Sequence, residues 1–263
     1  MSRVPARAIL ELYPKPHVVR EYTVQLNIVD DYDALSRAGA ELMADLVATK
    51  LAASIILATG ETPMGVYREL AALRQRGQFD ASRLRIFQLD AYVGLGPDDR
   101  RSLYGWMRRS FLDPLGVPDA NVVRLPGDAP DPELACAAYD AAAQAAGGID
   151  LAVLGLGPNG HLGFNEPPVD ASAPTRVVAL TPASIESNAR YWGERDDVPR
   201  YALTAGMSVL LAARRTLLVV SGAHKRAILR RAVEGPITPD VPASYLQQAN
   251  NVTILADKSA WGE

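Results

Sequence analysis

The stretch that decides the fold is "IDLAVLGLG", residues 149–157, followed by "PNGHLGFNEPP", residues 158–168. Its first part is continuously apolar, which is typical of a buried strand in a parallel sheet covered by helices on both faces. Its second part is rich in glycine and proline, so the chain leaves the sheet in an irregular loop. This loop carries His161 and Glu166, and we expect it at the carboxyl edge of the sheet, where such folds bind ligands.

The rest of the chain alternates between short apolar runs and stretches with helical spacing. Further strands are predicted at 54–59, 84–90, 121–126, 175–181, 214–222 and 251–257. Helices are predicted at 30–50, 64–77, 100–116 with a break at Asp113-Pro114, 131–148, 182–193, 207–213 and 223–235. This alternation predicts an α/β protein with a mainly parallel sheet and helices on both faces. We find no repeat and no linker, so we expect one domain over residues 1–263.

Composition narrows the class of protein. The chain has 263 residues, 48% of them hydrophobic, which is enough for one large core. A net charge of −3 indicates no nucleic-acid binding and leaves a small molecule or another copy of the chain as partner. The single Cys136 indicates a reducing compartment. Residues 1–22 contain no apolar run of signal length, and no run is long enough to span a membrane, so we expect a cytoplasmic protein.

The glycines of the opening stretch match a known phosphate-binding pattern. Gly155, Gly157 and Gly160 spell G-x-G-x-x-G, the dinucleotide fingerprint, which needs a helix starting at the third glycine. The residues after Gly160 are a poor helix start, and Pro158 removes a backbone donor. We therefore interpret the glycines as turning residues of a loop and expect no dinucleotide cofactor.

Two acidic positions and one histidine are candidates for proton transfer. His161 and Glu166 on one loop could form an acid–base pair, or an ion pair that only holds the loop. Asp90 ends a predicted strand and could be a base, although the residues alone favour a turn cap. A metal site is not indicated, because the chain has three histidines and neither an H-E-x-x-H motif nor a cysteine cluster.

A candidate anion site follows the strand at 54–59. Backbone N–H groups at Gly60 and Glu61, with the Thr62 hydroxyl, open the next predicted helix and could hold a phosphate. The alternative is an ordinary capped helix, which the Glu61 carboxylate favours because it would repel a phosphate unless it points away. Arg190 and Lys225 would complete a phosphate clamp if they converge in space, and would otherwise be solvated surface charges.

Together these segments resemble a known family. The motifs are "LATGETPMGVY", "FQLDAYVGL", "LGLGPNGHLGFNEPP", "SNARYW", "YALTAGMSVLL" and "SGAHKRAILRRAVEG", in an arrangement spanning about residues 30–257. The chain resembles the glucosamine-6-phosphate deaminases, within a wider group that includes galactosamine-6-phosphate isomerases and 6-phosphogluconolactonases. The "GFNEP" segment is similar to the deaminase branch. The resemblance implies a modified Rossmann-like fold.

The resemblance also implies a reaction, in which glucosamine 6-phosphate and water give fructose 6-phosphate and ammonia, with no redox cofactor and no catalytic metal. It assigns Asp90 as the base that moves a proton between C2 and C1, and His161 as the acid–base group that opens the sugar ring. Glu166 would support that histidine, with Asn159 in the same catalytic set. The phosphate ligands would be the backbone at Gly60 and Glu61 and the side chains of Thr62, Arg190 and Lys225. The segment around 166–193 would be a lid.

The chain departs from the family at or beside some of these positions. Asn159 stands where some members have aspartate, so it brings no negative charge beside His161. Ala91 replaces a common second acid, and Glu61 stands where small residues are usual. The alternatives that remain are a galactosamine-6-phosphate deaminase, a sugar-phosphate lactonase and a non-catalytic sugar-phosphate sensor, each as a monomer or a homo-oligomer.

Overall fold

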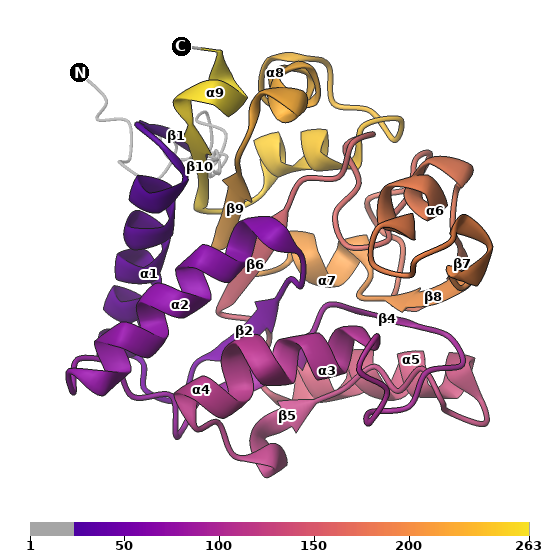
Figure 1. Cartoon of the computed structure of the whole chain (residues 1–263), viewed down its shortest axis with the longest axis horizontal. Helices are drawn as coiled ribbons and strands as arrows, with labels where there is room; N and C mark the ends of the chain where they lie inside the picture. Colours follow the sequence, from indigo (N-terminus) through magenta and orange to yellow (C-terminus); the bar gives the residue numbers. More distant parts are fainter. Residues whose placement is uncertain (1–23, 263) are drawn as a thin grey trace, which may run out of the picture.

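A seven-stranded parallel sheet forms the centre of the molecule (Figure 1), in a computed structural model that describes residues 24–262. The strand order is β1-β10-β9-β6-β2-β3-β5. The bounds are β1 Val24–Val29, β2 Ser54–Leu57, β3 Arg85–Gln88, β5 Val122–Val123, β6 Leu151–Gly155, β9 Thr216–Val220 and β10 Val252–Asp257. All six pairings are parallel. The α/β class with a mainly parallel sheet is therefore confirmed, and the sequence had missed β1.

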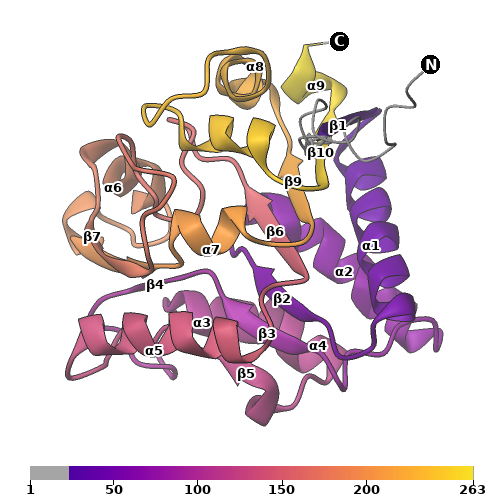
Figure 2. The same cartoon turned by 180° about the vertical axis from the view of Figure 1, so that it is seen from behind.

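Helices cover both faces of this sheet, as the apolar stretch at 149–157 indicated. Along β6, Leu151 and Val153 pack with one core cluster, and Ala152 and Leu154 pack with the other, because successive strand side chains point to opposite faces. Helices α1 (Tyr32–Thr49) and α2 (Glu61–Gln75) cover the first face. Seen from behind in Figure 2, the second face carries α5 (Pro132–Ala145), α7 (Met207–Leu211) and α8 (Arg226–Glu234).

A second, antiparallel sheet was not predicted. It has the order β4-β8-β7, with β4 at Asp90–Tyr92, β7 at Arg176–Ala179 and β8 at Tyr201–Thr204. The predicted strand 84–90 is wrong at its end, because the chain leaves the parallel sheet after Gln88 and Asp90 begins β4. The buried Gln88 amide donates to the Asp90 carbonyl across this turn, at 2.7 Å. The strand predicted at 175–181 belongs to this small sheet.

The small sheet and α6 (Pro182–Ala189) form a separate part of the molecule, to one side of the main layers in both views. A third apolar cluster holds this part together. Its buried members are Tyr92, Leu103, Phe164, Leu180, Ile185, Val198 and Ala202. Strand β4 therefore joins the large sheet to this outlying part, and Asp90 lies at the junction.

The segment at 100–116 corrects a second prediction. Helix α3 (Leu103–Met107) continues through a π-helical turn (Arg108–Leu112) into α4 (Asp113–Leu115), so the predicted break at Asp113-Pro114 is wrong. Pro114 therefore lies inside a continuous helical segment, which gives up one backbone hydrogen bond there because proline has no N–H. The helix ends instead at Gly116, in the left-handed conformation with φ 63°.

Short elements complete the described chain. They are the 3-10 turns Asp119–Asn121, Arg195–Asp197, Ala223–Lys225 and Pro242–Gln248 and the final helix α9, Lys258–Trp261. No helix within residues 24–262 has the length and apolar character needed to cross a membrane. The amino-terminal stretch in which we expect no signal segment, with His17, lies outside the described residues.

Candidate active site

A cavity of about 1020 Å³ opens at the carboxyl edge of the parallel sheet. Its floor consists of the residues that follow strands β2, β3, β6 and β9, which is where parallel sheets of this kind bind ligands. One wall comes from α6 and the residues after it, and another from α3. Seven predicted site residues line it: Gly60, Glu61, Thr62, Asp90, His161, Arg190 and Lys225. Asn159 and Glu166 do not, and they lie behind His161.

Glycine 157 allows the histidine to lie against the loop backbone. A Cβ on Gly157 would come within 2.1 Å of the His161 ring, so any side chain there would displace the imidazole. The Gly157 amide donates to the His161 carbonyl at 3.0 Å, and the Gly160 amide donates to the Gly157 carbonyl at 3.1 Å. No helix begins at Gly160, and residues 156–175 form an irregular loop. The G-x-G-x-x-G pattern therefore shapes the pocket of His161.

The Glu166 carboxylate holds this histidine in place. Its Oε2 accepts from Asn159 Nδ2 at 2.8 Å and lies 3.2 Å from His161 Nδ1. Its Oε1 accepts from the hydroxyl of Ser184, on helix α6. Burial raises the pKa of Glu166, but the hydrogen bonds and charge of these partners outweigh it and lower the pKa to about 2. Glu166 is therefore a permanent anion at neutral pH.

An ionised Glu166 determines which nitrogen of His161 is available. We assign the Nδ1 proton from the hydrogen-bond partners, since Nδ1 faces an acceptor that has no proton of its own. The second nitrogen, Nε2, then has no protein partner among residues 24–262. An imidazole oriented in this way by a carboxylate can accept a proton at Nε2 and return it, while the carboxylate stabilises the imidazolium.

Asp90 has the opposite environment. It is only 7% exposed, and no described residue donates a hydrogen bond to its carboxylate. Burial without such donors raises the pKa of Asp90 to about 7. A buried carboxyl group that changes its charge near neutral pH is suited to general base catalysis, and the turn-cap role that the residues alone favoured is absent here.

Two basic side chains, those of Lys225 and Arg190, line part of the cavity. Burial lowers the pKa of the Lys225 ammonium group, and the positive charge of Arg190 lowers it further. Lys225 and Arg190 both line this cavity, as the predicted phosphate clamp requires. Gly60, with φ 145°, is the N-cap of α2 and makes no side-chain cap bond, and the first residues of that helix line the cavity. These donors and cations together suit a phosphate group.

Glu61 does not point away from this anion site. Its Oε2 lies 3.3 Å from Arg190 Nη1, so the Glu61 carboxylate forms an ion pair with the guanidinium group that a phosphate would bind. Both side chains are largely exposed, and such pairs contribute little to stability. A ligand phosphate would therefore have to compete with Glu61 for Arg190.

Sequence reasoning missed an aromatic wall and one buried hydroxyl. The wall consists of Tyr92, Trp106, Phe164, Tyr191 and Trp192, which pack edge to face or tilted at centroid distances of 5.2 to 5.4 Å. The dipeptide Tyr191-Trp192 directly follows the candidate ligand Arg190, and that adjacency was a usable signal. Ser184 left no such signal, because it lies 18 positions from Glu166 in the chain.

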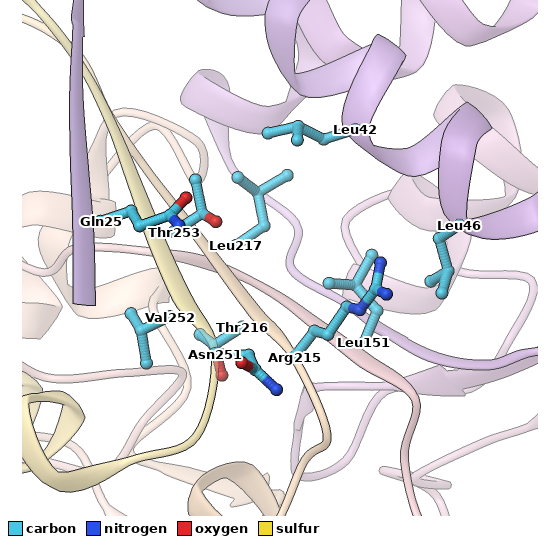
Figure 3. A pocket seen from close by; sticks show the side chains of 10 residues that line it. All are labelled: Gln25, Leu42, Leu46, Leu151, Arg215, Thr216, Leu217, Asn251, Val252 and Thr253. Atoms are coloured by element: carbon cyan, nitrogen blue, oxygen red, sulfur yellow. The ribbon is translucent and has the colours of Figure 1, made fainter. Parts of the chain in front are cut away.

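A smaller cavity, of about 260 Å³, lies at the opposite edge of the sheet (Figure 3). It is lined by the starts of β1, β6, β9 and β10 and by Leu42 and Leu46 of α1. Among the described residues that line it, Arg215 alone is charged, and none carries a carboxylate or an imidazole. The described lining therefore offers no acid–base pair. Within residues 24–262 there is also no group of three or more His, Cys, Asp or Glu side chains that could hold a metal ion.

Comparisons with known proteins agree on one family. The family model described as glucosamine-6-phosphate isomerases/6-phosphogluconolactonase matches residues 30–255. A glucosamine-6-phosphate deaminase of Corynebacterium aurimucosum is 41% identical over 223 residues, which are 85% of this chain and 87% of the relative. One from Cutibacterium acnes is 40% identical over 237 residues, 90% of this chain and 91% of the relative.

Solved structures extend the comparison. A monomeric glucosamine-6-phosphate deaminase superposes with a TM-score of 0.89 at 36% identity, covering 90% of this chain and 99% of that one. A 6-phosphogluconolactonase from Trypanosoma brucei superposes with a TM-score of 0.72 at 19% identity, covering 91% of this chain and 98% of that one. The second likeness, at its low identity, shows a shared fold alone.

Proposed function

Because this chain belongs to the family of glucosamine-6-phosphate isomerases and 6-phosphogluconolactonases, we propose that it acts on glucosamine 6-phosphate as a deaminase. The reaction takes up one water and gives fructose 6-phosphate and ammonia. The observation that carries the proposal is the pairing, in one cavity, of a carboxylate with a pKa of about 7 and a histidine held by a permanent anion. Its relatives named deaminases support the same activity.

Opening of the sugar ring is the first chemical step. The pyranose form must gain a proton on its ring oxygen and lose one from the C1 hydroxyl, which gives the open-chain aldehyde. His161 can move both protons through Nε2, and Glu166 lowers the cost of the transient imidazolium at Nδ1. Neither Glu166 nor Asn159 lines the cavity, so both act through the orientation of His161.

Isomerisation follows at C2 and C1. The Asp90 carboxylate removes the C2 proton, and the aldehyde oxygen gains a proton, which gives an enolamine. Return of the proton to C1 converts the enolamine into an iminium at C2. Water adds to this iminium, and ammonia leaves as the C2 ketone forms. A base with a pKa of about 7 suits both halves of this transfer, because it can take the proton and give it back.

The phosphate of the substrate positions the reacting carbons. Arg190, Lys225, Thr62 and the first amides of α2 would hold it in the cavity that Asp90 also lines. Binding energy gained there fixes the geometry at C1 and C2 and so contributes to the rate of the chemical steps.

We also propose that the segment around 166–193, which includes α6, acts as a lid over the cavity. The enzyme is further proposed to work in the cytoplasm, where phosphorylated sugars are retained.

Ammonia release tests the proposal directly. Purified protein is incubated in parallel with glucosamine 6-phosphate, galactosamine 6-phosphate and 6-phosphogluconolactone, with Asp90→Asn as the control variant. We expect ammonia from glucosamine 6-phosphate, and its loss in the variant. Ammonia from the galactosamine epimer alone would change the substrate and keep the mechanism. Lactone hydrolysis that persists in Asp90→Asn, without ammonia from either amino sugar, would overturn the proposed reaction.

A further inference from the structure

Helix α6 carries both a contact of Glu166 and a basic residue of the cavity. Near its start, Ser184 is fully buried, and its hydroxyl donates to Glu166 Oε1. At its end, Arg190 is the C-cap and lines the cavity. A helical rise of about 1.5 Å per residue separates these two positions by about 9 Å along one rigid element. A displacement of Arg190 can therefore move Ser184.

Ser184 is also the one described hydrogen-bond link between α6 and the set formed by His161, Glu166 and Asn159. The two carboxylate oxygens divide their partners. Oε2 serves the loop after β6, and Oε1 serves α6. Rotation or loss of the Oε1 contact would free the carboxylate to turn about its side chain, and His161 Nδ1 would follow it. The orientation of the imidazole thus depends on the position of α6.

The backbone of α6 holds the serine in place. The backbone amide of Ser184 donates to the Thr181 hydroxyl at 3.2 Å, and the Ser184 carbonyl accepts from Asn188 Nδ2 at 2.8 Å. Ile185, the next residue, is buried in the third apolar cluster. The backbone of Ser184 is therefore fixed within the helix, and the contact of its hydroxyl with Glu166 depends on where the helix lies.

We infer that Ser184 is a positioning residue that transmits phosphate binding at Arg190 to His161 through Glu166. This inference rests on the proposed function for its role in the reaction, since the phosphate is taken to be that of the substrate. Occupation of the clamp replaces Glu61 as the partner of Arg190 and sets the position of α6. Ser184 then holds the Glu166 carboxylate in the orientation that presents Nε2 of His161 to the sugar.

A double-mutant cycle measures this coupling in turnover. We expect Ser184→Ala to lower kcat about 10–100-fold, as removal of a group that orients a catalytic side chain does, with KM changed less than about 3-fold. In an Arg190→Gln background the same substitution should lower kcat less than about 3-fold, because phosphate binding no longer acts on α6 through Arg190. Ser184→Thr, which restores a hydroxyl, should recover most of the loss. Additive losses in the cycle would overturn the inference.

A matched control separates coupling from simple destabilisation. Ser244 is as deeply buried as Ser184, and the described partners of its hydroxyl are the carbonyl and amide of Thr238, six positions earlier in the chain. Ser244→Ala should therefore lower the unfolding temperature by a similar amount and leave kcat within about 2-fold. A loss of kcat in Ser244→Ala equal to that in Ser184→Ala would count against a specific role for Ser184.

A second measurement does not depend on turnover. Inorganic phosphate is titrated into the protein while the histidine ring signals are followed by NMR, with His161 assigned from the His161→Gln spectrum. His224 lines the cavity beside Lys225, so its signal reports that phosphate has bound. We expect phosphate to move the His161 signal in the wild type and to leave it unmoved in Ser184→Ala, while His224 responds in both. Equal movement of His161 in the variant, or none in the wild type, would overturn the inference even if no ammonia were released.

Discussion

The junction of β3 with β4 and the loop after β6 each carry one buried carboxylate of the candidate site, the first lining the cavity and the second holding His161, and the two groups behave in opposite ways. Asp90, at the junction, has no hydrogen-bond donor among the described residues, and burial raises its pKa to about 7. Glu166, on the loop, is also buried, but three donors lower its pKa to about 2. Burial alone therefore does not decide the role of an acid. The donors around it do, and they make Asp90 an exchanger of protons and Glu166 a fixed charge.

The largest effect should come from removing the exchanging carboxylate. Asp90→Asn keeps the shape of the side chain and removes the base, so kcat/KM for ammonia release should fall about 10³-fold or more. Substrate binding, measured by calorimetry, should change less than about 3-fold, because the phosphate clamp is untouched. A variant that kept a tenth of the activity would show that another group removes the C2 proton.

Removing the charge of Glu166 should lower kcat less than removing that of Asp90, and it should lower the stability of the folded protein. Glu166→Gln leaves an amide that can still contact Ser184 or Asn159 but no longer stabilises the imidazolium, so kcat should fall about 10–100-fold. A buried donor without its ionised partner costs about 1–3 kcal/mol, which lowers the unfolding temperature by several degrees. Thermal unfolding at pH 7 checks this result. An unchanged unfolding temperature would contradict the central place given to Glu166 in this loop.

The pH dependence separates the two carboxylates further. Asp90 must be ionised to act, so kcat/KM should rise with pH and level off above its pKa of about 7, losing about tenfold per pH unit below it. Because the folded state raises the pKa of Asp90, ionisation costs folding free energy as pH rises from 3.8 through about 7. Asp90→Asn should therefore unfold at a higher temperature than the wild type at pH 8, and this advantage should shrink toward pH 4. A difference in unfolding temperature between Asp90→Asn and the wild type that did not depend on pH would contradict the conclusion that burial raises the pKa of Asp90.

A smaller effect is expected at the phosphate end. Glu61→Gln removes the carboxylate that pairs with Arg190, so KM for the sugar phosphate should fall about 2–5-fold, with kcat within about 2-fold, since an exposed pair is worth at most about 1 kcal/mol. The effect should shrink at high salt. Glu69→Gln, on the same helix α2, is the matched change in net charge and should leave KM unaltered.

The smallest effect tests the cavity at the other edge of the sheet. Arg215→Gln removes the one charged side chain among the described residues that line it and should leave kcat and KM within about 2-fold of the wild type. A change in KM as large as that of Glu61→Gln would mean that the two edges of the sheet communicate.

Much of this site could be predicted from short stretches of sequence. The apolar run at 149–157 indicated a strand buried on both faces, and the glycines after it indicated a loop in place of a helix, because both depend on neighbouring residues. The rule that ligands bind at the carboxyl ends of parallel strands then placed His161, Asp90 and the Gly60 turn at one edge. The family resemblance assigned roles to these positions, and those roles remain predictions.

What only the tertiary structure decided depends on segments that are far apart in the chain. The sheet of β4, β8 and β7 joins Asp90 to residues more than 80 positions away, and no local periodicity reports such pairing. The contrast between Asp90 and Glu166 likewise follows from which donors the fold brings near, with Ser184 the clearest case. The pairing of Glu61 with Arg190 has the same origin. Sequence determines which groups can carry a charge, but burial and hydrogen-bond partners determine whether they do, because a pKa depends on all the atoms around the group.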